Sequence, residues 1–250
     1  MAINVNTVYQ TVLLILNKEQ RGYMTPTEFN SIGTQVQLEI FEKYFEDLNQ
    51  QIRVPQTDTD YADRVTNLDE KIAEFKTFGT AIYTTNGILN YFTLPTVDSY
   101  NNRVELYRLG TVLYNNEIEA QRVDRSDFYH IDKSILTKPS TNFPVYLYEN
   151  KFLFIKPTTI VSNINVDYVK KPSNVIWGFT VGSLGQYVNN PDTYNISTEP
   201  TGSLNFELHV SEQTEVILKI LLYAGIVIRD PQIVQVAAQQ VQAEEINKKS

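Results

Sequence analysis

The chain has 250 residues, enough for one large domain or two small ones, and 42% of them are hydrophobic. It contains no cysteine, which excludes a disulfide framework, a thiolate metal site and a cysteine nucleophile. Its formal net charge is −8, and tight, sequence-specific binding of nucleic acid is not expected, because that requires a basic patch.

Apolar spacing predicts two helices joined as a hairpin near the start of the chain. Residues 5–17 place apolar side chains at helical intervals, and Gly22 marks the end of this segment. The run Thr25-Pro26-Thr27-Glu28 then combines an N-cap threonine, a proline at the first helical position and a glutamate at the third, which is a capping box. We expect a helix of about 24 residues from there, with one apolar stripe from Phe29 to Leu48.

A third helix is predicted by apolar residues at alternating steps of four and three, from Tyr61 to Phe75, with Gly79 after its end. Such strict spacing gives a narrow seam, which suits packing against another helix of this chain or of a second copy. We therefore take Leu68, Ile72 and Phe75 as candidates for a subunit interface.

Between residues 80 and 171 the apolar period changes to two, which indicates an antiparallel β domain built as a meander. Asp124 is expected to cap a single helical turn inside it, with Phe128 facing inward. The segment INVDYVKK (164–171) is predicted as the last strand. Tight hairpin turns are predicted at Asn86-Gly87, Asn115-Asn116 and Glu149-Asn150.

Residues 172–210 are expected to form a long polar loop, least regular between residues 172 and 205. A stretch of this length without an obvious element is usually functional or ordered by a partner. The lone tryptophan, Trp177, lies in it and is a further interface candidate. A weak hairpin is predicted over GFTVGSLGQYV (178–188).

Residues 211–250 return to helix and are expected to form one helical body with residues 1–78. Ser211 is expected to cap a helix whose interior, VILKILLYAGIVI (216–228), is apolar on nearly every face. Such a helix must be buried all round, in a helical layer or at a subunit interface. A further helix is predicted to start at Asp230-Pro231. The interface candidates in this region are Ile217, Leu221, Ile228 and Val234. The expected fold class is α+β.

No residue pattern predicts catalysis, a metal site or a cofactor. His130 and His209 lack partners at zinc or triad spacing, and the aspartates at positions 58–63 lack the glycine and glutamate of a calcium loop. No phosphate-binding glycine loop and no GxSxG motif occurs. The apolar runs are shorter than the roughly 20 residues that span a bilayer. We therefore expect a protein that is not an enzyme, without cofactors and outside membranes.

The 16 tyrosines leave two functional classes open. Aromatic faces stack on sugars, so Tyr100, Tyr146, Tyr148 and Trp177 define a candidate platform, and a glycan- or ligand-binding β module with helical support is the alternative hypothesis. Tyrosine also suits half-exposed strands and protein interfaces, which is the interpretation we favour.

Three parts of the chain resemble neck proteins of tailed bacteriophages, and most of all the ring or adaptor subunits of short-tailed and crAss-like phages. They are INVNTVYQTVLLILNKEQRGYMTPTEFN (3–30) with QLEIFEKYFEDLN (37–49), FPVYLYENKFLFIKP (143–157) with VDYVKKP (166–172) and Trp177, and FELHVSEQTEVILKILLYAGIVIRDPQIVQ (206–235). None of these segments is a catalytic signature.

The resemblance implies a head-tail connector: a structural virion protein that forms a ring, commonly of twelve copies, and continues the DNA channel beneath the portal. The implied partners are copies of itself, the portal protein and other neck or tail proteins. DNA passes through without sequence-specific binding, and an acidic balance suits such passage because it gives little adhesion. The implied location is the virion neck, after assembly in the bacterial host cytoplasm.

Overall fold

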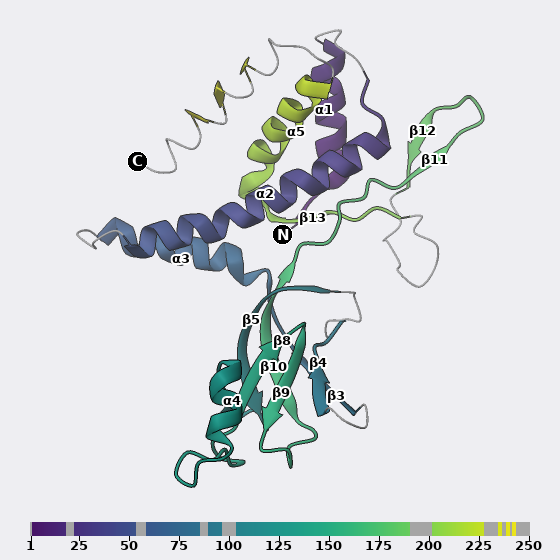
Figure 1. The fold of residues 1–250 in the computed structure, drawn as a ribbon. Helices are drawn as coiled ribbons and strands as arrows, with labels where there is room; N and C mark the ends of the chain where they lie inside the picture. Colours follow the sequence, from purple (N-terminus) through teal and green to yellow (C-terminus); the bar gives the residue numbers. More distant parts are fainter. Residues whose placement is uncertain are drawn as a thin grey trace. The chain divides into compact units, whose positions relative to one another are not determined.

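The chain forms two compact units, each described here by itself. The computed structural model describes residues 2–18, 23–53, 59–85, 90–96, 104–190, 202–227, 235–236, 239–240 and 242–243. One unit, the helical unit, comprises Met1–Glu74 and Pro172–Ser250; the other, the β unit, comprises Phe75–Lys171. The long helices lie in the first and the two larger sheets in the second (Figure 1), so the predicted α+β class is confirmed.

Four long helices form most of the helical unit. They are α1 (Val5–Lys18), α2 (Pro26–Arg53), α3 (Thr59–Ala73) and α5 (Gln213–Val227). Helix α2 packs against both α3 and α5, and α1 packs against α5 (Figure 1). Val12 on α1, Phe29 on α2 and Ile220 on α5 are all 0% exposed, so the apolar face of each helix meets a common core.

The capping box at the start of α2 is confirmed. The backbone N–H of Thr25 donates to Glu28 Oε2 at 2.9 Å, and the backbone N–H of Glu28 donates to Thr25 Oγ1 at 3.3 Å. The backbone N–H and the hydroxyl of Thr25 both favour the ionised carboxylate and lower the pKa of Glu28 below its usual value. The helix starts at Pro26 as predicted and has 28 residues, ending at Arg53.

The segment predicted as a long polar loop contains three strands. They are β11 (Phe179–Val181), β12 (Tyr187–Asn189) and β13 (Phe206–His209). Strands β11 and β12 form the hairpin predicted over residues 178–188. Strand β13 pairs antiparallel with β1 (Ala2–Ile3) near the other end of the sequence. The prediction of an irregular loop is therefore wrong for β13, whose four residues are too few for apolar alternation to identify a strand, while the hairpin predicted within the loop is confirmed.

The start of α5 also differs from the prediction. A short 3-10 helix, η1 (Val210–Glu212), precedes it, so Ser211 is not its N-cap. His209 takes the capping role for η1, because its Nδ1 accepts the backbone N–H of Ser211 at 3.3 Å. The helix predicted from Asp230-Pro231 lies mostly outside the described residues.

Helix α3 ends earlier than its apolar spacing predicts, at Ala73. Strand β2 (Lys76–Thr80) follows and includes Gly79, which was expected only to stop the helix. Strand β10 (Ile164–Lys171) draws this segment into a sheet: the Lys170 N–H donates to the Phe75 carbonyl at 2.8 Å, and Gly79 pairs with Val166. Long-range pairing thus overrides local helical spacing.

The β unit contains two sheets where a single meander was expected. Their orders are β2-β10-β5-β6 and β3-β4-β9-β8-β7, so β10 lies between two strands from much earlier in the chain. The pairs are antiparallel except for β7 with β8. The remaining strands are β3 (Ile82–Thr85), β4 (Asn90–Thr93), β5 (Glu105–Tyr114), β6 (Ile118–Glu119), β7 (Gln121–Arg122), β8 (Val145–Glu149) and β9 (Phe152–Lys156).

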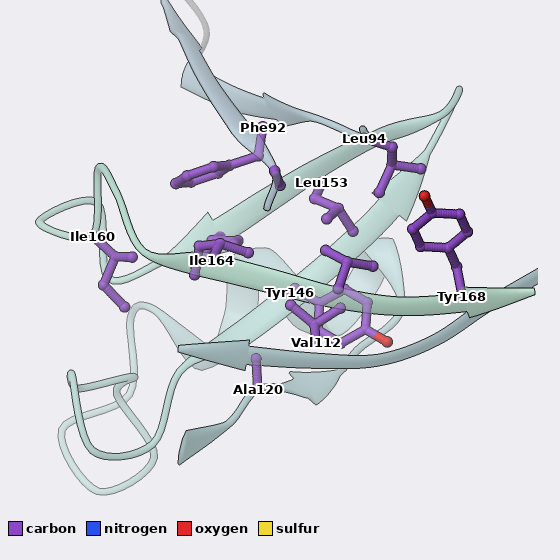
Figure 2. Close-up of a cluster of buried hydrophobic side chains, with 12 residues drawn as sticks. Phe92, Leu94, Val112, Ala120, Tyr146, Leu153, Ile160, Ile164 and Tyr168 are labelled. Carbon is purple, nitrogen blue, oxygen red and sulfur yellow. The ribbon is translucent and has the colours of Figure 1, made fainter. Parts of the chain in front are cut away.

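The core of the β unit lies between these two sheets. Val112 and Ile164 come from one sheet, Phe92 and Leu153 from the other, and all four belong to one buried cluster (Figure 2). Alternation sends Leu153 and Ile155 of β9, and Ile164, Val166 and Tyr168 of β10, into this cluster, and it makes the period of two visible in the sequence.

The turns of the β unit follow the predictions in part. Asn115 and Asn116 have φ values of 53° and 61°, the left-handed conformation that asparagine tolerates. The next turn uses Asn150-Lys151, one residue later than predicted. Thr85 pairs with Asn90, whereas a two-residue turn at Asn86-Gly87 would pair it with residue 88. That dipeptide lies outside the described residues.

Helix α4 (Arg125–Ile131) occupies the place predicted for a single helical turn. Phe128 is 6% exposed and packs against Val145 and Leu147 of β8, as predicted. Asp124 precedes the helix, but its side chain makes no capping hydrogen bond.

Candidate protein interface

A row of aromatic rings joins the interior of the helical unit to the β11–β12 hairpin. The ring of Trp177, which is 4% exposed, lies 4.4 Å from that of Tyr9 and 6.0 Å from that of Phe179 between centroids. Phe179 lies 5.0 Å from Tyr187, which stacks on Tyr23 at 6.5 Å. Aromatic contacts at these distances stabilise a fixed arrangement, so the hairpin is anchored through Phe179 at its base and through Tyr187 beside its turn.

Two asparagines hold Trp177 in place at this base. Its indole Nε1 donates to Asn6 Oδ1 at 3.0 Å, and its backbone N–H donates to Asn30 Oδ1 at 2.7 Å. Asn6 lies on α1 and Asn30 on α2, so one residue bridges two helices. The neighbouring Tyr9 hydroxyl donates to the Met24 carbonyl at 3.1 Å, and burial raises the pKa of Tyr9.

The hairpin carries exposed apolar side chains and no charge. Residues 178–190, GFTVGSLGQYVNN, include no charged residue and no proline. Leu184 at the turn is 90% exposed, Val181 is 63% and Val188 is 47% exposed. Figure 1 shows the hairpin extending away from the helices of its unit. Exposed strand edges are usually protected by charges or proline, so this hairpin has the character of a contact surface.

The β unit carries an apolar tip of its own, in the loop that follows α4. Ile135 is 99% exposed, Leu136 is 96% and Phe143 is 78% exposed. Lys156 Nζ donates to Asp132 Oδ2 at 2.7 Å at the start of this loop, and this hydrogen bond lowers the pKa of Asp132. We therefore take these neighbouring, almost fully exposed apolar residues as a candidate interaction site.

A third apolar surface follows the edge strands β2 and β3. Phe78 on β2 is 66% exposed and Ile82 on β3 is 64% exposed. Each strand is the outermost one of its sheet in the described part of the chain. The sequence from Thr77 to Thr85 contains no charged residue.

Two buried carboxylates mark the place where α2 and α3 meet the start of α5. Glu212 accepts from Lys71 Nζ at 2.5 Å, and Glu215 accepts from Lys43 Nζ at 3.3 Å. Glu212 and Glu215 are 1% and 4% exposed. Burial, reinforced by the charge of Glu212, raises the pKa of Tyr44 beside them. Because a lysine holds each carboxylate, this ion-pair cluster fixes how the helices pack and offers no free acid or base.

A similar contact joins the middle of α2 to α5. The Tyr223 hydroxyl donates to the Glu39 carboxylate, which also pairs with Lys219 Nζ at 3.7 Å. The hydrogen bond to Glu39 raises the pKa of Tyr223 to about 12. These contacts explain how α5 carries a lysine and a tyrosine within an otherwise apolar sequence.

The structure corrects half of the predicted interface residues. Those buried inside the chain are Ile72 (2% exposed), Phe75 (1%), Leu221 (7%) and Trp177 (4%). They do not offer the free apolar surface expected of them, because the chain already covers them. Leu68 and Ile217 are half-buried, while Ile228 and Val234 lie outside the described residues. The exposed pair Ile135-Leu136 was missed, although two aliphatic residues within a polar loop are a visible signal.

The aromatic platform proposed for a glycan is not formed by the predicted residues. Tyr146 is 5% exposed, Trp177 is 4% exposed and Tyr148 is half-buried, while Tyr100 lies outside the described residues. Burial raises the pKa values of Tyr146 and Tyr148. The faces of these rings therefore pack against protein.

Three further findings bear on the class of protein. Within the described residues no group of three or more histidine, aspartate or glutamate side chains could hold a metal ion. None of the helices in the described part of the chain has the length and apolarity needed to cross a bilayer. No protein-family model matches the chain, and no curated protein shows significant similarity to it.

Proposed function

We propose that this chain is a structural virion protein, a subunit of a neck ring that joins a phage portal to the tail and continues the DNA channel. The observation that supports the proposal is that each unit presents exposed apolar side chains on an anchored segment. Leu184 marks that segment in the helical unit, and Ile135-Leu136 marks it in the β unit. Two such surfaces suit a protein that contacts several neighbours at once, as a connector must.

The chemistry of the chain fits the partners of such a ring. Copies arranged in a ring meet through heterologous contacts, in which one surface of a subunit binds a different surface of the next. The portal protein and other neck or tail proteins then bind the remaining faces. A net charge of −8 lets DNA pass through with little adhesion, and the resemblance to phage neck proteins points to the same role.

The test is the mass of the assembly. The full chain is expressed alone and together with the portal protein encoded by the same genome, and each product is studied by native mass spectrometry and negative-stain microscopy. We expect a closed ring, either alone or seated on the portal. A chain that stays monomeric under both conditions, and that is missing from purified virions, contradicts the proposal.

A further inference from the structure

We propose that the β11–β12 hairpin of one copy adds to the open edge of β3 in a second copy, and that this contact closes the ring. The inference rests on the proposed ring function and goes further, because it names the two surfaces that meet. The recognition is between two uncharged strand edges, through backbone hydrogen bonds and apolar side chains.

The hairpin directs unused backbone groups outward. The Asn190 N–H donates to the Gly178 carbonyl at 2.9 Å, and the Gly182 N–H donates to the Gln186 carbonyl at 2.8 Å. Hydrogen-bonded pairs alternate along an antiparallel ladder, so Thr180 and Val188 form the bonded pair between them.

The residues on either side of this pair therefore turn their N–H and C=O groups away from the hairpin. On β11 these are Phe179 and Val181, and on β12 they are Tyr187 and Asn189. In the described part of the chain, β11 and β12 pair only with each other. Two edges able to accept a further strand thus lie beside exposed apolar side chains.

The matching edge is β3. It is outermost in the five-stranded sheet and, within the described residues, pairs only with β4. The Tyr83 ring packs 5.2 Å from Phe92 in the core, so Ile82 and Thr84 lie on the opposite face of the strand. Ile82 is 64% exposed.

Charge selects β3 from the four edge strands of the two larger sheets. Strand β2 begins with Lys76, β6 includes Glu119 and β7 includes Arg122, whereas β3 has the uncharged sequence IYTT. An uncharged edge is best covered by an uncharged strand, because no ion then loses its hydration. The hairpin, residues 178–190, meets this requirement.

A second copy is the occupant that these features favour. The hairpin belongs to the helical unit and β3 to the β unit, and neither strand edge carries a charged residue that would exclude the other. One chain therefore carries both halves of a head-to-tail contact. Each added copy leaves one hairpin and one β3 edge free until the ring closes, which is how a heterologous interface yields a closed assembly.

The first experiment uses the absence of cysteine from the chain. Thr180→Cys and Thr84→Cys are made as separate proteins, assembled together and treated with a short bis-maleimide. The two cysteines come within reach of this cross-linker whether β11 or β12 pairs with β3, and also when the pairing is shifted by a residue or two. We expect a cross-linked dimer only in the mixture. Ser126→Cys, exposed on α4, replaces Thr180→Cys in the control and should give none. An assembled ring with no more Thr180–Thr84 cross-link than the control overturns the inference.

The second experiment introduces charge at matched positions. Val188→Lys lies on the hairpin and Val161→Lys lies on a loop outside both edges, and the two valines are 47% and 49% exposed. We expect Val188→Lys to weaken ring formation at least tenfold, while Val161→Lys assembles like the wild type. Circular dichroism of both variants should match that of the wild type.

Proline variants test the backbone pairing itself. Val181→Pro and Asn189→Pro each remove one outward N–H and leave the bonds inside the hairpin intact. At least one should prevent ring closure. If the ring still forms with Val188→Lys and with both proline variants, the inference about the hairpin is overturned and the proposed ring function is not. This holds even if a tail protein no longer binds to those variants. A wild-type chain that forms no ring, alone or on the portal, overturns both.

Discussion

Single side chains fix the helical unit at points that are far apart in the sequence. Glu212 lies 141 residues from the lysine that neutralises it, and Trp177 lies 171 residues from the asparagine that accepts its indole N–H. A buried carboxylate without its partner keeps the full cost of leaving water. The stability of this unit therefore depends on a few long-range polar contacts as well as on its apolar core.

The ion pair between Lys71 and Glu212 gives the sharpest test at this scale. Lys71→Met removes the cation that pairs with the carboxylate of Glu212, a residue that is only 1% exposed. We expect the free energy of unfolding to fall by about 3–5 kcal/mol in urea titrations. The control is Arg125→Met, which breaks the exposed Arg125–Glu149 pair and should change stability little. Equal losses in the two variants would contradict this interpretation of the cluster.

The capping box at α2 predicts a smaller and pH-dependent effect. Thr25→Ala removes the side-chain cap and should lower the free energy of unfolding by about 1 kcal/mol, while Thr25→Ser should preserve it. The folded state lowers the pKa of Glu28, so its contribution is present above the usual value of 4.5. It disappears as the pH falls through the lowered pKa. Urea titrations of wild type and Glu28→Gln across this range should therefore converge in acid.

These two sites differ in how far the sequence could predict them. The capping box lies within four consecutive residues, so the local sequence alone is enough to predict its hydrogen bonds. Lys71 and Glu212 belong to segments that meet only after folding, and no local pattern connects them. The same holds for Trp177, whose place among polar residues suggested an exposed loop although its ring is buried.

At the scale of elements, the spacing of apolar residues correctly predicted the helices and strands whose positions depend on local sequence. Helix α1 and strand β10 lie where the apolar spacing placed them. The predicted end of α3 was wrong because the residues after Phe75 form a strand that pairs with β10. Exposure was harder to predict, since it depends on which surfaces the folded chain covers. Leu221 is 7% exposed and Leu184 is 90% exposed, although both are leucines.

The loop after α4 supplies the prediction at the scale of elements, which is that its exposed apolar residues bind a neighbouring protein. Ile135→Asp combined with Leu136→Asp should abolish attachment to the portal or tail neighbour, because both side chains are nearly fully exposed and no longer suit an apolar partner. The melting temperature should stay within a few degrees of the wild type. Pull-down with the co-expressed neighbours measures the first effect. Thr137→Asp with Ser140→Asp adds the same charge to the same loop and should leave attachment intact.

At the scale of the whole molecule, the helical unit and the β unit each have a hydrophobic core of their own. Leu153 lies in the core of the β unit, whereas the single tryptophan lies in the helical unit. Leu153→Ala should therefore destabilise the β unit by about 2–5 kcal/mol and leave the midpoint of the Trp177 fluorescence transition unchanged. Far-UV circular dichroism should separate into two steps. A fluorescence midpoint that shifts together with the circular dichroism would mean that both units unfold together.

One contact bears on the order in which the two units can fold during translation. Val5 donates its backbone N–H to Asn205 Oδ1 at 3.0 Å, and β1 needs β13 as its partner. The β unit is continuous, so it can finish while translation is still under way. The helices made first must wait for α5, with Val12 and Phe29 uncovered in the nascent protein. The late synthesis of β13 and α5 thus sets the time at which a new subunit can finish folding and assemble with its neighbours.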